Sequence, residues 1–262
     1  MIMHRNNSTL KLVMPLSPLL ATAVMGTLAS LYAFVIRPRH LRWGATDNEV
    51  KASSAADDLV PNPTGEATHA ITINAPVSEV WPWLVQMGQD KAGFYSYSLL
   101  ENLFGCQLQN AERILPEFQN LRAGDSVRLH PEVPPLPVLI CEPNKALVLG
   151  SNLSHPGTWG FFLKPIDGKT TRLIVRGREQ WRNNVLYSLY YRVLFEPAHF
   201  VMERRMLLGI KERAERLSSK TGTCRELPVP RTGTVFRSNR RRYTLRRTPR
   251  PRSQSRDSVM KD

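Results

Sequence analysis

The sequence predicts an α+β fold in which a curved antiparallel sheet is covered on one face by helices. Two observations support this prediction. The first is the order of the predicted elements between residues 67 and 219, namely one strand, two helices, a run of strands and one long helix. The second is the amphipathic pattern of residues 197–217, whose apolar stripe requires a neighbouring surface to cover it. With 42% hydrophobic residues, the chain can form a core of this kind.

The first strand is predicted over residues 68–75, where polarity alternates and one face carries His69 with two isoleucines. Residues 77–88 follow the helical pattern, and a kink is expected at Pro82. A capping box opens a second, short helix over residues 98–105. This strand and the two helices form the first part of the predicted domain.

The central part of the domain is predicted to consist of strands. Their residues are 125–130, 137–141, 146–150, 158–165 and 170–178. Asp167-Gly168 predicts a tight hairpin between the last two of them. The long amphipathic helix over residues 197–217 then closes the domain.

An uncharged apolar segment, Leu12–Ile36, precedes the domain. A helix that crosses a bilayer core requires about 20 such residues, so residues 1–40 are predicted to hold a single transmembrane anchor. More Lys and Arg residues follow the segment than precede it, which favours a cytoplasmic globular domain. The alternative is a cleaved secretory signal, after which the chain is exported.

The positive charge of the chain is concentrated at its C-terminal end. The net charge is +14, and residues 220–262, with 13 Lys and Arg against 3 Asp and Glu, carry +10 of it. These residues are predicted to form a disordered basic tail, with nucleic acid, anionic lipid or no partner at all as the alternatives. The overall charge is therefore no indication that the folded domain binds nucleic acid. Residues 41–66 are polar and are predicted to form a linker.

No metal or cofactor site is predicted. The three cysteines lie far apart without CxxC spacing, and the six histidines are scattered without metal-binding spacing. The sequence contains no GxGxxG motif, no phosphate-binding loop and no GxSxG motif. These observations leave ligand binding, catalysis without a cofactor and protein binding as the function classes to consider.

Four segments carry a resemblance to a known family. They are ITINAP followed by VSEVWPWLVQMGQ, then GFYSYSLLENLFG, the hairpin TWGFFLKP–DG–TTRLIVRGR, and the closing helix EPAHFVMERRMLLGIKERAE. Together they resemble the helix-grip fold of the SRPBCC superfamily, which includes polyketide cyclase/dehydrase-like proteins and START-type lipid carriers. The resemblance covers residues 67–218 and extends to a bacterial branch of largely uncharacterised, sometimes membrane-tethered members. It implies a cavity between the sheet and the long helix, in which family members carry lipids, hormones or polyketides and some catalyse reactions.

The aromatic residues concentrated between Ala75 and Gly105 are expected to line or buttress this cavity. Phe94, Tyr95 and Tyr97 are the favoured candidates, because the turn between the two helices closes one mouth of the cavity in this fold. For each aromatic residue, the alternative is a place in the packed core. The predicted ligand-binding residues are Trp83, Phe94, Tyr95, Tyr97, Trp159, Phe161, Arg176, Phe200, Glu203 and Leu207.

The closing helix carries one carboxylate within its apolar stripe. On a helical wheel, Glu203 falls at the centre of the arc that contains Met206 and Ile210, and His199 lies one turn before it. A buried carboxylate without a partner is costly. Glu203 is therefore expected either to pair with His199 or an arginine as a structural contact, or to act with His199 as a catalytic acid–base pair.

Three arginines of the strand 170–178 alternate with its apolar residues. If the apolar set with Val175 faces the core, the arginines form a solvated face. If Ile174 faces the core instead, Arg176 also points inward and is available to Glu203 or to a ligand carboxylate.

The favoured function is the binding of a hydrophobic small molecule or lipid in an internal cavity of a membrane-tethered domain. The first alternative is a cyclase/dehydratase-type enzyme that uses His199 and Glu203. The second is a non-catalytic adaptor with a filled interior. The apolar segment Val185–Phe195 is interpreted either as a packed lid or core helix, or as a second segment that contacts the bilayer beside Leu12–Ile36.

Overall fold

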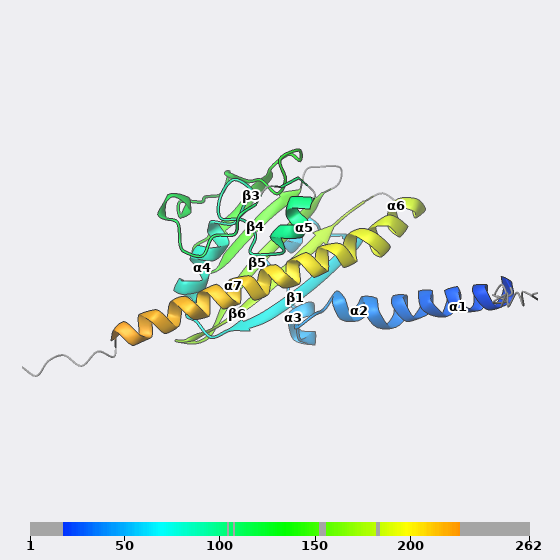
Figure 1. Cartoon of the computed structure of the whole chain (residues 1–262), viewed down its shortest axis with the longest axis horizontal. Coiled ribbons are helices and arrows are strands. Elements are labelled where there is room, and N and C mark those ends of the chain that lie inside the picture. The colour runs from blue at the N-terminus through cyan, green and yellow to red at the C-terminus, as the bar shows by residue number, and fades with distance from the viewer. Residues whose placement is uncertain (1–17, 104, 107, 152–155, 182–183, 226–262) are drawn as a thin grey trace, which may run out of the picture. The chain divides into compact units, whose positions relative to one another are not determined.

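The computed structural model describes residues 18–103, 105–106, 108–151, 156–181 and 184–225, and it confirms the predicted α+β class (Figure 1). Within these residues, six strands form one sheet in the order β1-β6-β5-β4-β3-β2. Each pairs antiparallel with its neighbour. The strands are β1 (Gly65–Ile73), β2 (Ser126–Val127), β3 (Leu136–Glu142), β4 (Ala146–Ser151), β5 (Gly157–Asp167) and β6 (Thr170–Glu179).

The hairpin formed by β5 and β6 sets which side chains face the core. Its register pairs Gly157 with Glu179 at one end and Asp167 with Thr170 at the turn. Val175 is 1% exposed and belongs to the main hydrophobic core. The apolar set of β6 that contains Val175 therefore faces the core, as the first of the two alternatives for this strand predicts.

The closing helix α7 (Glu196–Arg225) lies along the sheet, as Figure 1 shows. It packs against β1 and against α4 (Val77–Val85). Its most deeply buried side chains are Met206, Leu207, Ile210 and Ala214. The amphipathic helix predicted over residues 197–217 is thus confirmed. The first residues of the predicted basic tail continue this helix, and residues 226–262 lie outside the part of the chain that the structure describes.

The turn before α5 (Ser98–Leu103) lies very close to the backbone of α7 at Gly209. A Cβ atom at Gly209 of α7 would overlap the backbone carbonyl oxygen of Tyr95. Tyr95 itself has a positive φ of 58°, a conformation that few residues other than glycine adopt. The absence of a side chain at position 209 therefore lets this turn reach the helix. The 3₁₀ helix η3 (Pro116–Phe118) follows farther along the chain.

The N-terminal helix consists of three consecutive parts. They are α1 (Pro18–Leu31), the π-helical η1 (Tyr32–Ile36) and α2 (Arg37–His40). Residues Leu20–His40 are long and apolar enough to cross a membrane, with a mean hydropathy of 1.5. A signal sequence near the N-terminus meets the same criterion. Residues 12–17 of the predicted anchor lie outside the described residues.

The polar segment between the N-terminal helix and β1 is folded against the sheet, whereas its composition predicts a linker. Its short helices are α3 (Asp47–Lys51) and η2 (Asp57–Leu59). Thr46 and Glu49 form a capping box at the start of α3. Arg172 of β6 binds the Glu49 carboxylate, with 2.7 Å between Nε and Oε1. Glu49 and Asp57 of the segment thus find their partners in arginines of the outer sheet face.

Candidate ligand cavity

A cavity of about 450 Å³ is lined by residues of α7 and of the sheet. This volume lies within the range that is typical of small-molecule sites. The strands β1, β4, β5 and β6, the chain around α5, and η4 (Tyr191–Phe195) with α7 all contribute to its wall. Apolar members of the wall are Phe94, Leu108, Leu129, Leu136, Leu149, Trp159, Phe195, Phe200, Met202 and Met206.

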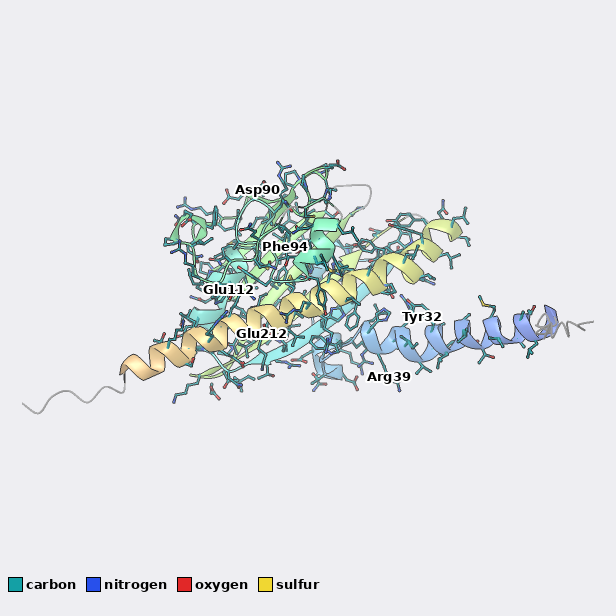
Figure 2. All side chains as sticks on the ribbon, viewed as in Figure 1. Tyr32, Arg39, Asp90, Phe94, Glu112 and Glu212 are labelled. Carbon is teal, nitrogen blue, oxygen red and sulfur yellow. The ribbon has the colours of Figure 1, made fainter. Side chains whose placement is uncertain are left out.

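Four predicted ligand-binding residues line this cavity. They are Phe94, Trp159, Phe200 and Glu203, and the catalytic candidate His199 lines it too. Phe94 comes from the segment that precedes α5, and Figure 2 marks its position in the domain. The structure therefore brings together residues from the turn, from β5 and from α7 around one space.

The other six predicted residues are Trp83, Tyr95, Tyr97, Phe161, Arg176 and Leu207, and none is among the residues that line the cavity. The rings of Trp83 and Tyr95 pack in the core with their centroids 5.7 Å apart. Phe161 and Leu207 are fully buried in the same core. For these four, the alternative of a place in the core is the observed one. Tyr97 is 41% exposed, because consecutive side chains of the turn point in different directions.

Glu203 is the centre of a hydrogen-bonded cluster in the cavity wall, and only 4% of its side chain is exposed. Its Oε1 atom lies 2.6 Å from Nδ1 of His69, and its Oε2 atom accepts a hydrogen bond of 2.9 Å from Nε1 of Trp159. Nδ1 of His199 lies farther away, 3.6 Å from Oε2. The main partner of Glu203 is therefore His69, which the sequence prediction did not include.

One proton lies between His69 and Glu203. Nε2 of His69 is 2.8 Å from the backbone carbonyl of His40, and since a carbonyl oxygen only accepts, Nε2 carries a hydrogen. Burial by itself raises the pKa of Glu203, but the hydrogen bond from His69, the charges of the nearby histidines and the bond from Trp159 outweigh it. The pKa of Glu203 is thus held below its usual value, which favours its carboxylate form.

The backbone around His69 fixes the position of its ring. The amides on either side of His69 donate to the carbonyls of Leu41 and Trp43, at 2.9 and 3.0 Å. These bonds align the chain after the N-terminal helix with β1 and bring the His40 carbonyl to the ring. A signal for His69 was present in the sequence, because it shares a strand face with two isoleucines and such a face turns toward the core.

Glu196 forms a second buried cluster at the start of α7. Its Oε1 atom lies 3.0 Å from Nε2 of His40, and its Oε2 atom accepts a hydrogen bond of 2.9 Å from Arg37. Glu196 and His40 are both 7% exposed, and both line the cavity. Tyr32 donates its hydroxyl hydrogen to the backbone carbonyl of Arg192 and points toward that part of the chain in Figure 2. The end of the N-terminal helix is therefore part of the cavity wall.

Arg176 lies on the outer face of the sheet and does not reach Glu203, so the hypothesis that pairs them is wrong. It is 4% exposed, and its Nη1 atom lies 3.0 Å from Oδ2 of Asp57. The guanidinium also donates to three backbone carbonyls between residues 49 and 52, at 2.7–3.0 Å. The expected solvated arginine face is likewise corrected, because the segment before β1 covers it.

Both oxygens of Glu203 accept hydrogen bonds from the protein. His199, with 42% of its side chain exposed, is the member of the cluster most accessible from the cavity. Across the described parts of the chain, no group of three or more His, Cys, Asp or Glu side chains is arranged to hold a metal ion. The arrangement can orient a ligand through hydrogen bonds, and its histidines can exchange a proton.

No protein-family model and no curated protein matches the chain. Similar solved structures include a protein from Mesorhizobium loti, with 16% identity and a TM-score of 0.35, covering 58% of this chain and 98% of that one. The Aha1 dimer from Colwellia psychrerythraea has 15% identity and a TM-score of 0.33, covering 58% and 97%. A Polyketide_cyc-like protein from Corynebacterium glutamicum has 15% identity and a TM-score of 0.30, covering 62% and 93%.

The topology of the chain itself defines the fold. A strand, two helices, further antiparallel strands and a long closing helix follow one another within residues 65–225. The sheet order places the first strand beside the last one. The closing helix packs on the sheet, and the cavity lies where both contribute side chains. The chain has a helix-grip fold.

Proposed function

We propose that the chain is a membrane-tethered domain that binds a hydrophobic small molecule or lipid in its internal cavity. The observation that carries this proposal is the cavity of about 450 Å³, whose wall is mostly apolar. Transfer of an apolar ligand from water into such a wall is favourable. The adaptor alternative predicts a filled interior, so the cavity supports the binding function over it.

Exposed apolar side chains on two helical segments support a bilayer beside the domain. On the N-terminal helix and on the segment α6 (Val185–Tyr190) with η4, the residues more than 50% exposed include Leu20, Met25, Leu28, Phe34, Val185, Leu186, Leu189 and Leu194. Contiguous exposed apolar surface is typical of membrane contact. Tyr191 and Phe195 of η4 line the cavity, so this segment borders both the proposed bilayer and the proposed ligand.

The tether is tested by washing membranes that carry the full-length protein with alkaline carbonate. The protein is expected to stay with the membranes and to keep its N-terminus, because Leu20–His40 has the length and hydropathy of a spanning helix. Protease added to intact cells is expected to spare the domain, since Arg37 and Arg39 favour the cytoplasmic side. Release of a protein with a trimmed N-terminus contradicts the tether and favours the secretory signal.

Gly177 offers a way to fill the cavity without disturbing its wall. It lines the cavity, and a Cβ atom at this position meets no heavy atom within 4 Å. The full-length protein is purified in a mild detergent, and the molecules that remain bound are identified by mass spectrometry. The wild type is expected to retain a hydrophobic molecule, and Gly177→Leu is expected to lose most of it.

Gly168 provides the matched control. It lies in the turn between β5 and β6, it has equally open surroundings, and it does not line the cavity. Gly168→Leu is therefore expected to retain the bound molecule at the level of the wild type. Equal retention in Gly177→Leu, or a wild type without any bound molecule, contradicts the proposed binding function.

The cyclase/dehydratase alternative now rests on the hydrogen-bonded pair of Glu203 and His69, with His199 beside it. A carboxylate and an imidazole in an apolar cavity provide a site for proton transfer. The wild type and His199→Ala are compared for chemical conversion of the molecule that co-purifies. Conversion that His199→Ala abolishes while the molecule stays bound supports the enzyme, and its absence in the wild type leaves the binding function.

A further inference from the structure

The cavity wall is rich in carboxyl groups and contains no lysine or arginine among the described residues that line it. The lining glutamates are Glu66, Glu101, Glu179, Glu196 and Glu203. The carboxylate of Glu66 lies 3.8 and 3.7 Å from Arg176 and Arg178 on the outer face of the sheet. Glu196 and Glu203 are also held by partners within the protein. The wall therefore offers an anionic ligand no lysine or arginine to pair with.

Glu101 of α5 lacks such partners. It is 8% exposed, it lines the cavity, and its Oε2 atom has no hydrogen-bond partner. Burial raises the pKa of Glu101, which favours its neutral form. A neutral carboxyl group both donates and accepts a hydrogen bond. An unpartnered group of this kind in the wall points to a polar atom of a ligand.

Thr158 of β5 also has a hydroxyl oxygen without a hydrogen-bond partner, and it is 5% exposed. Its side chain alternates with that of Trp159, which faces the cavity, and its strand partner is Arg178 on the outer face of the sheet. The Thr158 hydroxyl therefore points away from the ligand. Among the described residues, Glu101 is the place in the wall where a ligand gains a hydrogen bond that the protein does not supply itself.

We infer that the cavity takes an uncharged or cationic amphiphile, whose hydroxyl, carbonyl or amine group bonds to Glu101, and that it excludes carboxylates and phosphates. This inference rests on the proposed binding function and names the class of ligand. An anionic head group would lose its water shell beside Glu101 and Glu179, and no lysine or arginine of the described wall would compensate for that loss. An uncharged head group loses less hydration and gives the unpartnered Glu101 a hydrogen bond.

The test uses the full-length protein in phosphatidylcholine vesicles and three photoreactive probes. The probes share one dodecyl chain with a diazirine and end in an alcohol, an amine or a carboxylate. Mass spectrometry measures the labelling of β4 and β5, which line the cavity, relative to the labelling of α1. The α1 reference corrects for the different partition of each probe into the bilayer. The alcohol and amine ratios are expected to exceed the carboxylate ratio by about tenfold or more.

The cavity-filling variant separates two kinds of failure. Labelling of β4 and β5 that Gly177→Leu does not reduce for any probe overturns the proposed binding function, and the ligand class falls with it. Labelling that depends on Gly177 but is as strong for the carboxylate as for the alcohol overturns the ligand class alone.

Substitutions at Glu101 test the polar position itself. Glu101→Leu removes the donor and is expected to lower labelling by the alcohol probe about fivefold, whereas Glu101→Gln keeps an N–H donor and is expected to restore it. Glu117→Leu is the matched control, because Glu117 is exposed on η3 and does not line the cavity. Equal labelling in Glu101→Leu and Glu117→Leu overturns the assignment of Glu101 as a ligand contact.

Discussion

Glu203 and Glu101 line the same cavity in opposite environments. Both are almost fully buried, with 4% and 8% of their surface exposed. Glu203 accepts hydrogen bonds from His69 and Trp159, whereas one oxygen of Glu101 has no partner. The comparison teaches that burial alone does not define the role of a carboxyl group. Partners from the protein make Glu203 a stabilising contact, and their absence leaves Glu101 available to a ligand.

The largest expected effect on stability comes from removing the carboxylate of Glu203. Glu203→Gln is expected to lower the free energy of unfolding by about 3–5 kcal/mol, because the substitution removes the carboxylate that His69 and Trp159 contact in the buried cluster. A denaturant melt followed by tryptophan fluorescence measures the change. Glu212→Gln is the control, since the Glu212 side chain is 57% exposed in a surface ion pair with Arg205. A loss no larger than that of the control would show that the cluster does not stabilise the fold.

Arg176 extends the comparison to the outer face of the sheet. Arg176→Met is expected to cost about 2–3 kcal/mol, because it removes charge-assisted hydrogen bonds to Asp57 and to three backbone carbonyls. The same melt is used, with Arg205→Met as the exposed counterpart. If the two variants unfold alike, the segment before β1 does not depend on Arg176 for its attachment.

Replacing the unpartnered Glu101 is expected to change the free energy of unfolding in the opposite direction. Glu101→Leu is expected to raise the free energy of unfolding by about 1 kcal/mol, because a buried polar atom without a hydrogen bond is replaced by an apolar group. The melt is measured without added ligand. A clear decrease in stability would mean that Glu101 has a partner within the protein, and the contrast with Glu203 would disappear.

The smallest expected effects are two opposite pH dependences. The folded pKa of Glu203 lies below its usual value of 4.5, so its stabilisation is complete above pH 4.5 and is lost as the pH falls through the folded value. The folded pKa of Glu101 lies above 4.5, so stability falls as the pH rises from 4.5 through that value. Melts across this range are expected to show a smaller acid-side slope in Glu203→Gln and a smaller higher-pH slope in Glu101→Leu than in the wild type. Identical slopes in wild type and variants would contradict both directions.

The fold could be predicted from the sequence because its elements follow strong local patterns. The alternating strand 68–75, the turn Asp167-Gly168 and the apolar stripe of residues 197–217 each lie within one element. The same reasoning found Glu203, because a helical wheel needs no knowledge of other elements. His199 was preferred as its partner for the same reason, since the two share a helix.

The parts that were missed depend on contacts between distant segments. His69 lies 134 residues before Glu203, and only the placement of β1 against α7 brings the two together. In the turn before α5, the positive φ of Tyr95 directs its ring into the core while Phe94 reaches the cavity. The segment before β1 was judged by its polar composition, although Thr46 and Glu49 already formed a recognisable capping box.

Glu196 belongs both to the cavity wall and to the contacts of the N-terminal helix, through Arg37 and His40. A ligand group that bonds to Glu196 competes with these two side chains for the same oxygens. Coupling of this kind is reciprocal, so the free energy by which the helix contacts weaken such a ligand equals the free energy by which the ligand loosens the helix. The fraction of cavities that hold a ligand and the strength of the N-terminal helix contacts would then depend on each other.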